Sequence, residues 1–161
     1  MAASALCRLC SPAIGIITDP TPGQTVREQA IPEALANHGY TPDTDYIRSA
    51  PWGVNGGHAA ASELLRDHPD IDAILTADDM QALGALTAVH AAGKMPGKDV
   101  AVIGVGNLLG DHSHAQLTTI DQQIEHGAQL GAQTLLDRLR GKKRIPKEIP
   151  IAPKLIARQT G

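Results

Sequence analysis

Two neighbouring carboxylates and a glycine-bounded turn are the groups in this sequence best placed to contact a small molecule. Asp78 and Asp79 follow the apolar run 71–75, and the turn 104–107 follows a second apolar run at 100–103. Both runs have the composition of strands buried on both faces of a parallel sheet, and the residues between them repeat at helical spacing. In such βαβ units, ligands collect at the carboxyl ends of the strands. We therefore expect a binding site where these aspartates and the turn meet.

Other reactive side chains lack the partners that catalysis or metal binding needs. Cys7 and Cys10 form a CxxC pair, but no second CxxC or HxxxH pair accompanies it and no strand precedes it. His112 and His114 lie in a glycine-containing loop without further ligands. The adjacent aspartates at the helix start point in different directions, so they do not form an acid–base pair. With no GxSxG, phosphate-loop or GxGxxG motif, the sequence predicts no enzyme, no cofactor and no metal site.

The elements that position these residues alternate between strand and helix along the chain. Apolar runs of strand length and segments with helical periodicity follow each other, separated by loops rich in proline, glycine and aspartate. Pro32 should kink its helix or move the helix start toward Ile31. Pro150 and Pro153 restrict an extended segment at 149–157 to a sheet edge or to irregular pairing. We expect an α/β fold with a mostly parallel sheet, with strands at 13–18, 45–48, 71–75, 100–103 and 117–120 and helices at 25–37, 54–66, 80–92 and 122–140.

Composition limits both the fold and the partners. The 161 residues suffice for one compact domain, and 42% are hydrophobic but only 2% aromatic, so alanine, leucine, isoleucine and valine must form the core. The net charge of −3 lacks the basic footprint of direct nucleic-acid binding. No apolar run reaches membrane-spanning length, and the segment 1–9 is a poor match to a signal peptide because its apolar part is short and Arg8 comes late. We expect a cytoplasmic protein that does not enter a membrane.

Three stretches together resemble the effector-binding domain of lactose-repressor-type (LacI/GalR) transcriptional regulators. They are DAILTADDMQALGALTAVHAAGKMPGKDVAVIGVGN, LTTIDQQIEHGAQLGAQTLLDRLRGKK and the ending APKLIARQTG. The resemblance covers nearly everything from Ile14 onward. It implies a three-layer lobe of the periplasmic-binding-protein type, with helices on both faces of the sheet. It also implies a sugar-like or nucleoside-like effector and a homodimer.

Regulators of this family begin with a DNA-binding headpiece and a first α/β lobe, and neither precedes Ile14. The resemblance therefore implies an irregular segment at 1–12 and a C-terminal lobe at 13–161, which reaches DNA only through a headpiece absent from this chain. Helix 122–140 matches the crossover helix that packs on the first lobe, so we expect it to be the least securely held long element. Helix 80–92 matches the dimer contact. A lobe of a periplasmic-type sugar-binding protein and a fragment that binds nothing remain alternatives.

Several residues match ligand-binding positions of the family. Arg27 stands where an arginine grips vicinal ligand oxygens, although a solvated helix arginine has the same pattern. Trp52 matches an aromatic that stacks on a sugar face, or it simply anchors its loop. Asp78 replaces an asparagine, which keeps an acceptor and loses the amide donor. Gln122 follows the TT strand and can bind either the ligand or backbone at the crossover.

The turn at 105–107 departs from the family pattern. An aspartate that accepts hydrogen bonds from sugar hydroxyls is common where this chain has Gly106. Asn107 can replace it from one position along, so we include Asn107 among the expected ligand-binding residues. We interpret Asp79 as the N-cap of the following helix.

Overall fold

One six-stranded sheet organises the computed structural model, which describes residues 13–20, 25–41, 43–109, 114–142 and 148–161. The strand order is β2-β1-β3-β4-β5-β6, and all neighbours are parallel except the antiparallel pair β5 and β6. The strands are β1 (Ile14–Thr18), β2 (Ile47–Ser49), β3 (Ala73–Thr76), β4 (Ala101–Val105), β5 (Thr118–Asp121) and β6 (Lys154–Ile156). The expected α/β fold with a mostly parallel sheet is confirmed, and the proline-flanked last strand lies at an edge.

Helices connect these strands nearly as predicted. They are α2 (Thr25–Asn37), the short 3-10 helix η2 (Thr44–Tyr46), α3 (Val54–Asp67), α4 (Asp79–Ala91) and α5 (Ile124–Leu139). Pro32 lies inside α2 without moving its start from Thr25. The predicted strand 45–48 is wrong at its beginning, because the Asp43 carboxylate accepts from the backbone N–H of Asp45 and starts η2 there. No helix among the described residues is long and apolar enough to cross a membrane.

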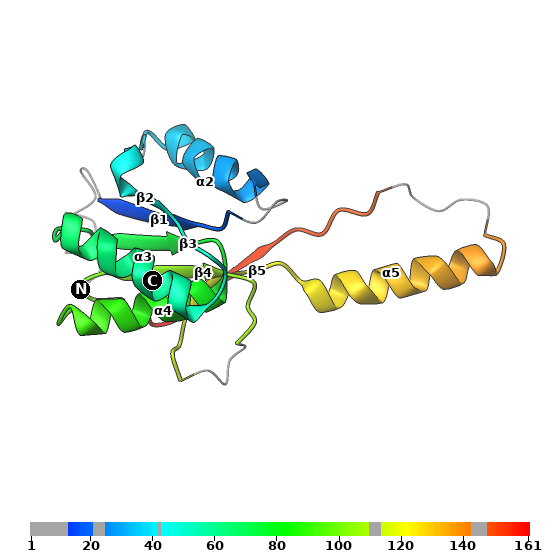
Figure 1. Ribbon diagram of the computed structural model, residues 1–161. Helices are drawn as coiled ribbons and strands as arrows, with labels where there is room; N and C mark the ends of the chain where they lie inside the picture. Colours follow the sequence, from blue (N-terminus) through cyan, green and yellow to red (C-terminus); the bar gives the residue numbers. More distant parts are fainter. Residues whose placement is uncertain (1–12, 21–24, 42, 110–113, 143–147) are drawn as a thin grey trace.

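Helices cover both faces of the sheet. Figure 1 shows α2 over one face and α3 with α4 on the other. The buried core contains Ile17, Leu64, Ile74, Val89 and Val102, so aliphatic side chains fill it as the composition requires. Glycines let α3 and α4 approach closely, since a Cβ on Gly57 of α3 would collide with the backbone of Gln81 in α4.

Helix α5 and the segment that returns from it form an arm that leaves the lobe (Figure 1). None of the sixteen residues of α5 is buried. Large apolar side chains are exposed along it, including Leu139 at 75% and Ile124 at 57%. Ile151 of the returning segment lies against Gly127, but the described part of the chain buries no residue of this helix.

The chain comes back from the arm into the middle of the lobe. Thr160 bridges β4 and β5: its carbonyl accepts from the backbone N–H of Val102, and its hydroxyl accepts from the N–H of Thr118. The same hydroxyl donates to the Val102 carbonyl at 2.7 Å. The residues after β6 therefore complete the hydrogen bonding of the two strands that flank the turn 104–107.

Candidate ligand-binding site

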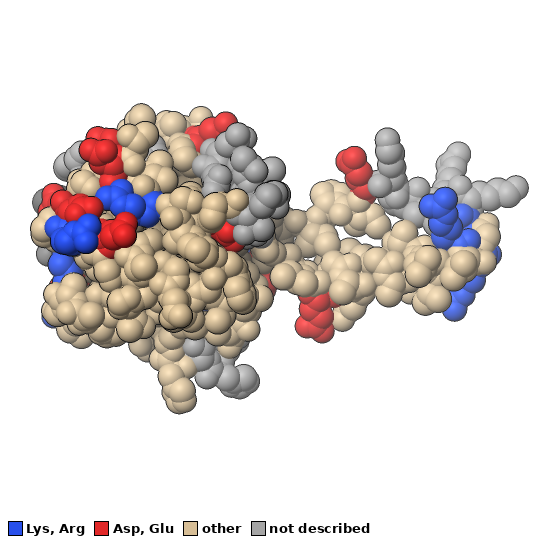
Figure 2. Space-filling view, viewed as in Figure 1, with Lys and Arg blue, Asp and Glu red and all other residues tan. Residues whose placement is uncertain are grey.

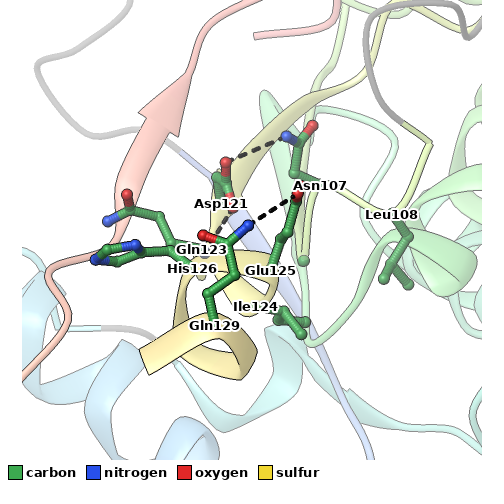
Figure 3. Close-up of a pocket in the computed structure, with 9 residues that line it drawn as sticks. Asn107, Leu108, Asp121, Gln123, Ile124, Glu125, His126 and Gln129 are labelled. Carbon is green, nitrogen blue, oxygen red and sulfur yellow. Dashed lines mark hydrogen bonds between the residues drawn. The ribbon is translucent and has the colours of Figure 1, made fainter. Parts of the chain in front are cut away.

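The carboxyl ends of β1, β3, β4 and β5 lie along one edge of the sheet, as parallel pairing requires. A hollow of about 570 Å³ lies at this edge, between the turn after β4, the end of β5 and the first turn of α5 (Figure 3). Its walls combine carboxylates, amides and an imidazole with two apolar side chains. The lining residues are Gly106, Asn107, Leu108, Asp121, Gln123, Ile124, Glu125, His126 and Gln129.

Asn107 is the predicted site residue that the structure places in this hollow. Its amide is oriented by two neighbours: Oδ1 accepts from Nη2 of Arg158 at 2.9 Å, and Nδ2 donates to Oδ2 of Asp121 at 3.3 Å (Figure 3). The residue has a positive φ of 54°, which asparagine tolerates better than most residues. One N–H of the amide and lone pairs on Asp121 remain for a ligand with several hydroxyl groups.

Asp79 fixes the turn that carries Asn107. Its carboxylate accepts from the backbone N–H of Leu108 at 2.7 Å and from the Thr119 hydroxyl at 2.5 Å, and the residue is only 1% exposed. Gly104 must lack a side chain here, because a Cβ would contact Oδ1 of Asp79. The prediction that Asp79 caps α4 is wrong, since its tertiary partners on β5 and the turn hold its carboxylate.

Asp78 is the N-cap of α4 instead. Its Oδ1 accepts from the backbone N–H groups of Met80 and Gln81, at 2.6 and 2.9 Å. Burial raises the pKa of this carboxyl above its ordinary value of 3.8; the two N–H groups oppose the shift, and the charges of Asp19 and Asp79 add to it. Asp78 therefore lies at the sheet edge, but it is not among the residues that line the hollow.

Trp52 is presented on a loop that a buried side chain holds in place. Gln81, on α4, donates from Nε2 to the carbonyls of Ala50 at 2.9 Å and Thr18 at 3.3 Å, and so ties the loop to the end of β1. The indole itself is 59% exposed, so it does not anchor the loop by burial. Sequence reasoning missed Gln81, because its place three residues after an N-cap aspartate indicates a capping role, whereas its side chain binds carbonyls that are distant in sequence.

The remaining predicted residues lie apart from the hollow or outside the described side chains. Gln122 is half-buried just before α5, and its neighbour Gln123 lines the hollow instead, with a φ of 53° and its N–H bonded to Oδ1 of Asp121 at 2.6 Å. Arg27 belongs to α2, but its side chain lies outside the described part, as do Cys7, Cys10 and His112. Among the described residues, no group of three or more His, Cys, Asp or Glu is placed to hold a metal ion.

Comparisons with known proteins agree with this architecture. Residues 5–160 match the model of the periplasmic binding protein-like domain. The HTH-type transcriptional regulator CelR of Thermobifida fusca is 31% identical over 136 residues, which are 84% of this chain and 40% of CelR. The D-ribose/D-allose-binding protein of Pseudomonas aeruginosa is 37% identical over 100 residues, 60% of this chain and 31% of that protein.

Solved structures give the same result. A CelR–cellobiose complex has a TM-score of 0.81 at 28% identity, and the match covers 98% of this chain and 49% of that one. A LacI-family regulator from Corynebacterium glutamicum has a TM-score of 0.77 at 26% identity, and the match covers 99% of this chain and 61% of that one. The chain thus spans less than half the length of the curated relatives named above. It belongs to the periplasmic binding protein-like domain family, and its relatives are chiefly LacI-type transcriptional regulators.

Proposed function

We propose that this chain is the effector-binding and dimerisation lobe of a LacI-type transcriptional regulator. The observation that carries the proposal is the hollow at the carboxyl edge of the sheet, whose far wall is the first turn of a helix that leaves the lobe. CelR, a relative with the same fold, is a transcriptional regulator whose structure has been solved as a complex with cellobiose. Most of the relatives named above are transcriptional regulators, which supports a role that is not enzymatic and a location in the cytoplasm.

The effector in this proposal is a small sugar-like or nucleoside-like molecule. Asn107 would offer its remaining amide N–H to a hydroxyl, and Trp52 its exposed indole to a ring face. Asp78, Gln122 and Arg27 complete the proposed ligand-binding set at neighbouring positions of the same edge. Asp79 would not contact the ligand in this proposal. It holds the turn that carries Asn107, because its carboxylate accepts from the backbone N–H of Leu108.

Fluorescence titration tests the proposal, because Trp52 is the only tryptophan in the chain. We expect sugars to change its emission with weak, millimolar affinity, since one lobe offers part of an enclosing surface and leaves its polar contacts wet. Replacing Asn107 by Ala should weaken this binding, whereas Gln133→Ala on the exposed middle of α5 should not. Absence of any response to a panel of sugars and nucleosides, or equal affinity in the Asn107→Ala protein, would contradict the proposal.

Homodimerisation through α4 is part of the same proposal. The outer side of α4 borders a groove of about 380 Å³. Its walls combine the apolar Leu83, Leu86, Met95 and Pro96 with polar residues that include Thr87, His90 and Gln159. Met95 is more than half exposed. We expect sedimentation to show a dimer at high micromolar concentration and Leu83→Glu to weaken it; a strict monomer at that concentration would contradict dimerisation through this face.

Contact with DNA is assigned to another part of the regulator. On the face of the lobe shown in Figure 2, most of the surface is uncharged, and acidic and basic side chains lie next to one another on one side of it. Further basic side chains lie toward the end of α5, where Arg138, Arg140 and Lys142 are found. The net charge of −3 also disfavours phosphate contacts. We expect no sequence-selective, salt-sensitive shift of duplex DNA by this chain in a gel assay.

A lobe of a periplasmic-type sugar receptor is the second candidate. The 37% identity to the D-ribose/D-allose-binding protein over 100 residues favours it. The two candidates differ in what the gene encodes upstream of these residues. An in-frame helix-turn-helix supports the regulator, and a signal peptide supports the receptor.

A further inference from the structure

Asn107 and Asp121 form a pair of polar groups on the wall of the hollow. Nδ2 of Asn107 and Oδ2 of Asp121 are 3.3 Å apart, and both residues belong to the lining (Figure 3). Neither residue is fully buried. The other carboxylate oxygen, Oδ1 of Asp121, accepts from the backbone N–H of Gln123 at 2.6 Å. A molecule in the hollow therefore meets an amide and a carboxylate side by side.

Two neighbours fix the orientation of the Asn107 amide. A guanidinium group has only donors, so the amide atom that faces Nη2 of Arg158 at 2.9 Å must be the oxygen. An ionised carboxylate has only acceptors, so the amide atom that faces Asp121 must be the nitrogen. Both neighbours require the same orientation, and each of them excludes the flipped amide. The pair therefore offers the hollow an N–H donor from the amide and acceptors from the carboxylate.

Arg158 is itself held at the start of β5. Its Nη1 donates to the carbonyl of Leu117 at 2.7 Å, and its backbone N–H donates to the Thr118 hydroxyl at 2.9 Å. Leu117 and Thr118 are 1% and 2% exposed, so both anchors belong to the buried part of the lobe. The guanidinium thus connects the start of β5 to the turn that carries Asn107.

A hydroxyl is the chemical group that fits this pair. It accepts from the amide N–H and donates its own proton to the carboxylate. An ether or carbonyl oxygen only accepts, so it leaves the carboxylate without a donor, and a phosphate is also repelled by the negative charge. An ammonium group only donates, so it faces the amide N–H without accepting from it.

We propose that Asn107 and Asp121 together bind one hydroxyl group of the effector, and that Arg158 is the positioning residue that makes the pair selective. This inference rests on the proposed function and narrows its ligand to a molecule with a free hydroxyl at the contacted position. Asp121 determines the specificity, because its carboxylate needs a donor. Arg158 acts through Asn107 and is not among the residues that line the hollow.

Nuclear magnetic resonance titration of the full chain tests this pair, because it measures weak binding and follows the signal of the Asn107 side-chain amide. The probes are D-glucose, D-ribose and the analogues of each in which one hydroxyl at a time is replaced by fluorine. Fluorine nearly keeps the size of the group and removes its donor. We expect one position at which fluorine weakens binding roughly tenfold or more, because the carboxylate then has no donor.

The variants are compared through the ratio of two dissociation constants, that of the fluorinated sugar over that of the parent sugar, because general damage to the lobe weakens both ligands alike. Asp121→Asn should lower this ratio to about threefold or less. Arg158→Met should also lower it, whereas Arg158→Lys, which keeps a cationic donor, should restore it. Asp70→Asn and Lys154→Met each remove a charge at an exposed position and should leave the ratio unchanged.

The outcomes separate this inference from the proposed function. If no single fluorine weakens binding, or if Asp121→Asn keeps the ratio, then no hydroxyl donates to this carboxylate and the assignment is wrong, while sugar binding by the lobe stands. If Arg158→Met keeps the ratio, the positioning role of Arg158 is wrong. If neither parent sugar binds at millimolar concentration, both this inference and the proposed function are contradicted.

Discussion

Helices α4 and α5 follow each other as the two long connections of the C-terminal half, yet they have opposite surroundings. Eight of the thirteen residues of α4 are buried, and no residue of α5 is. Both helices contain glycines, but Gly84 in α4 lies against the backbone of α3, whereas Gly131 in α5 has open space around it. The lobe thus buries its own apolar side chains. Helix α5 carries apolar side chains of the kind that pack in a core, but they are not buried. Its partner surface must come from outside the described residues.

Hydrogen exchange should give the largest difference between the two helices. We expect amides of α4 to exchange only with global unfolding, and amides of α5 to exchange through local opening at much lower free energy, because an isolated helix of this length is marginal in water. The measurement is native-state exchange followed by mass spectrometry on a sample shown to be monomeric. Equal protection in α4 and α5 in that sample would mean that the lobe does cover α5.

Truncating one leucine in each region gives the next largest contrast. Leu64 is completely buried between α3 and the sheet, so Leu64→Ala should lower the free energy of unfolding by about 2–5 kcal/mol. Leu139 is largely exposed on α5, and Leu139→Ala should change it by less than about 0.5 kcal/mol. Urea denaturation of both variants measures this. A comparable loss in Leu139→Ala would show that α5 is packed in solution, for example in a dimer.

Replacing a glycine by alanine should lower the stability in one region and raise it in the other. Gly57→Ala forces a Cβ into the backbone of Gln81 and should destabilise the lobe by about 1–3 kcal/mol, since two helices must move apart. Gly131→Ala meets no neighbour and should stabilise α5 by up to about 1 kcal/mol through helix propensity. Circular dichroism at 222 nm and thermal melts report both effects. A neutral Gly57→Ala would argue against the close approach of α3 and α4.

The smallest expected contrast is in pH dependence. The pKa of Asp78 is raised by burial, so the folded state binds its proton more tightly, and stability falls as the pH rises from the unfolded value of 3.8 toward the folded pKa. The pKa of Asp137 on α5 is lowered, first by its hydrogen bond from Lys142, so its stabilisation is present above the unfolded pKa and is lost as the pH falls through the folded one. Asp78→Asn should therefore remove a decrease in stability with rising pH. Asp137→Asn should remove a slight increase in stability with rising pH. Urea midpoints between pH 3 and 7 measure both slopes.

The local sequence pattern was enough to predict the helices and strands. It failed for side chains whose hydrogen-bond partners are distant in sequence. The strand, helix and strand at 73–105 follow from periodicity and from capping residues next to them in sequence. The local pattern does not indicate which of the two adjacent aspartates caps α4. The Asp79 carboxylate binds Leu108 and Thr119, which lie 29 and 40 residues further along the chain. Gln81 was missed for the same reason: its partners are the carbonyls of Thr18 and Ala50.

The position of the hollow could be predicted, but its lining could not. Parallel strands guarantee that polar ends share an edge, which led to Asn107. Whether Gln122 or Gln123 turns into the hollow depends on one residue with positive φ at the start of α5, and nothing in a glutamine pair indicates which residue adopts it. Roles assigned to Arg27 and Gln122 by family resemblance stay predictions.

The hydrogen bonds of Thr160 impose an order on biosynthesis. Thr160 joins Val102 and Thr118, which precede it by 58 and 42 residues, and the whole of α5 is translated in between. A ribosome must therefore extrude the apolar helix before the last residues can lock β4 to β5. During that interval the nascent chain presents both an incomplete sheet and an uncovered helix, so we expect chaperones that recognise aliphatic segments to bind it.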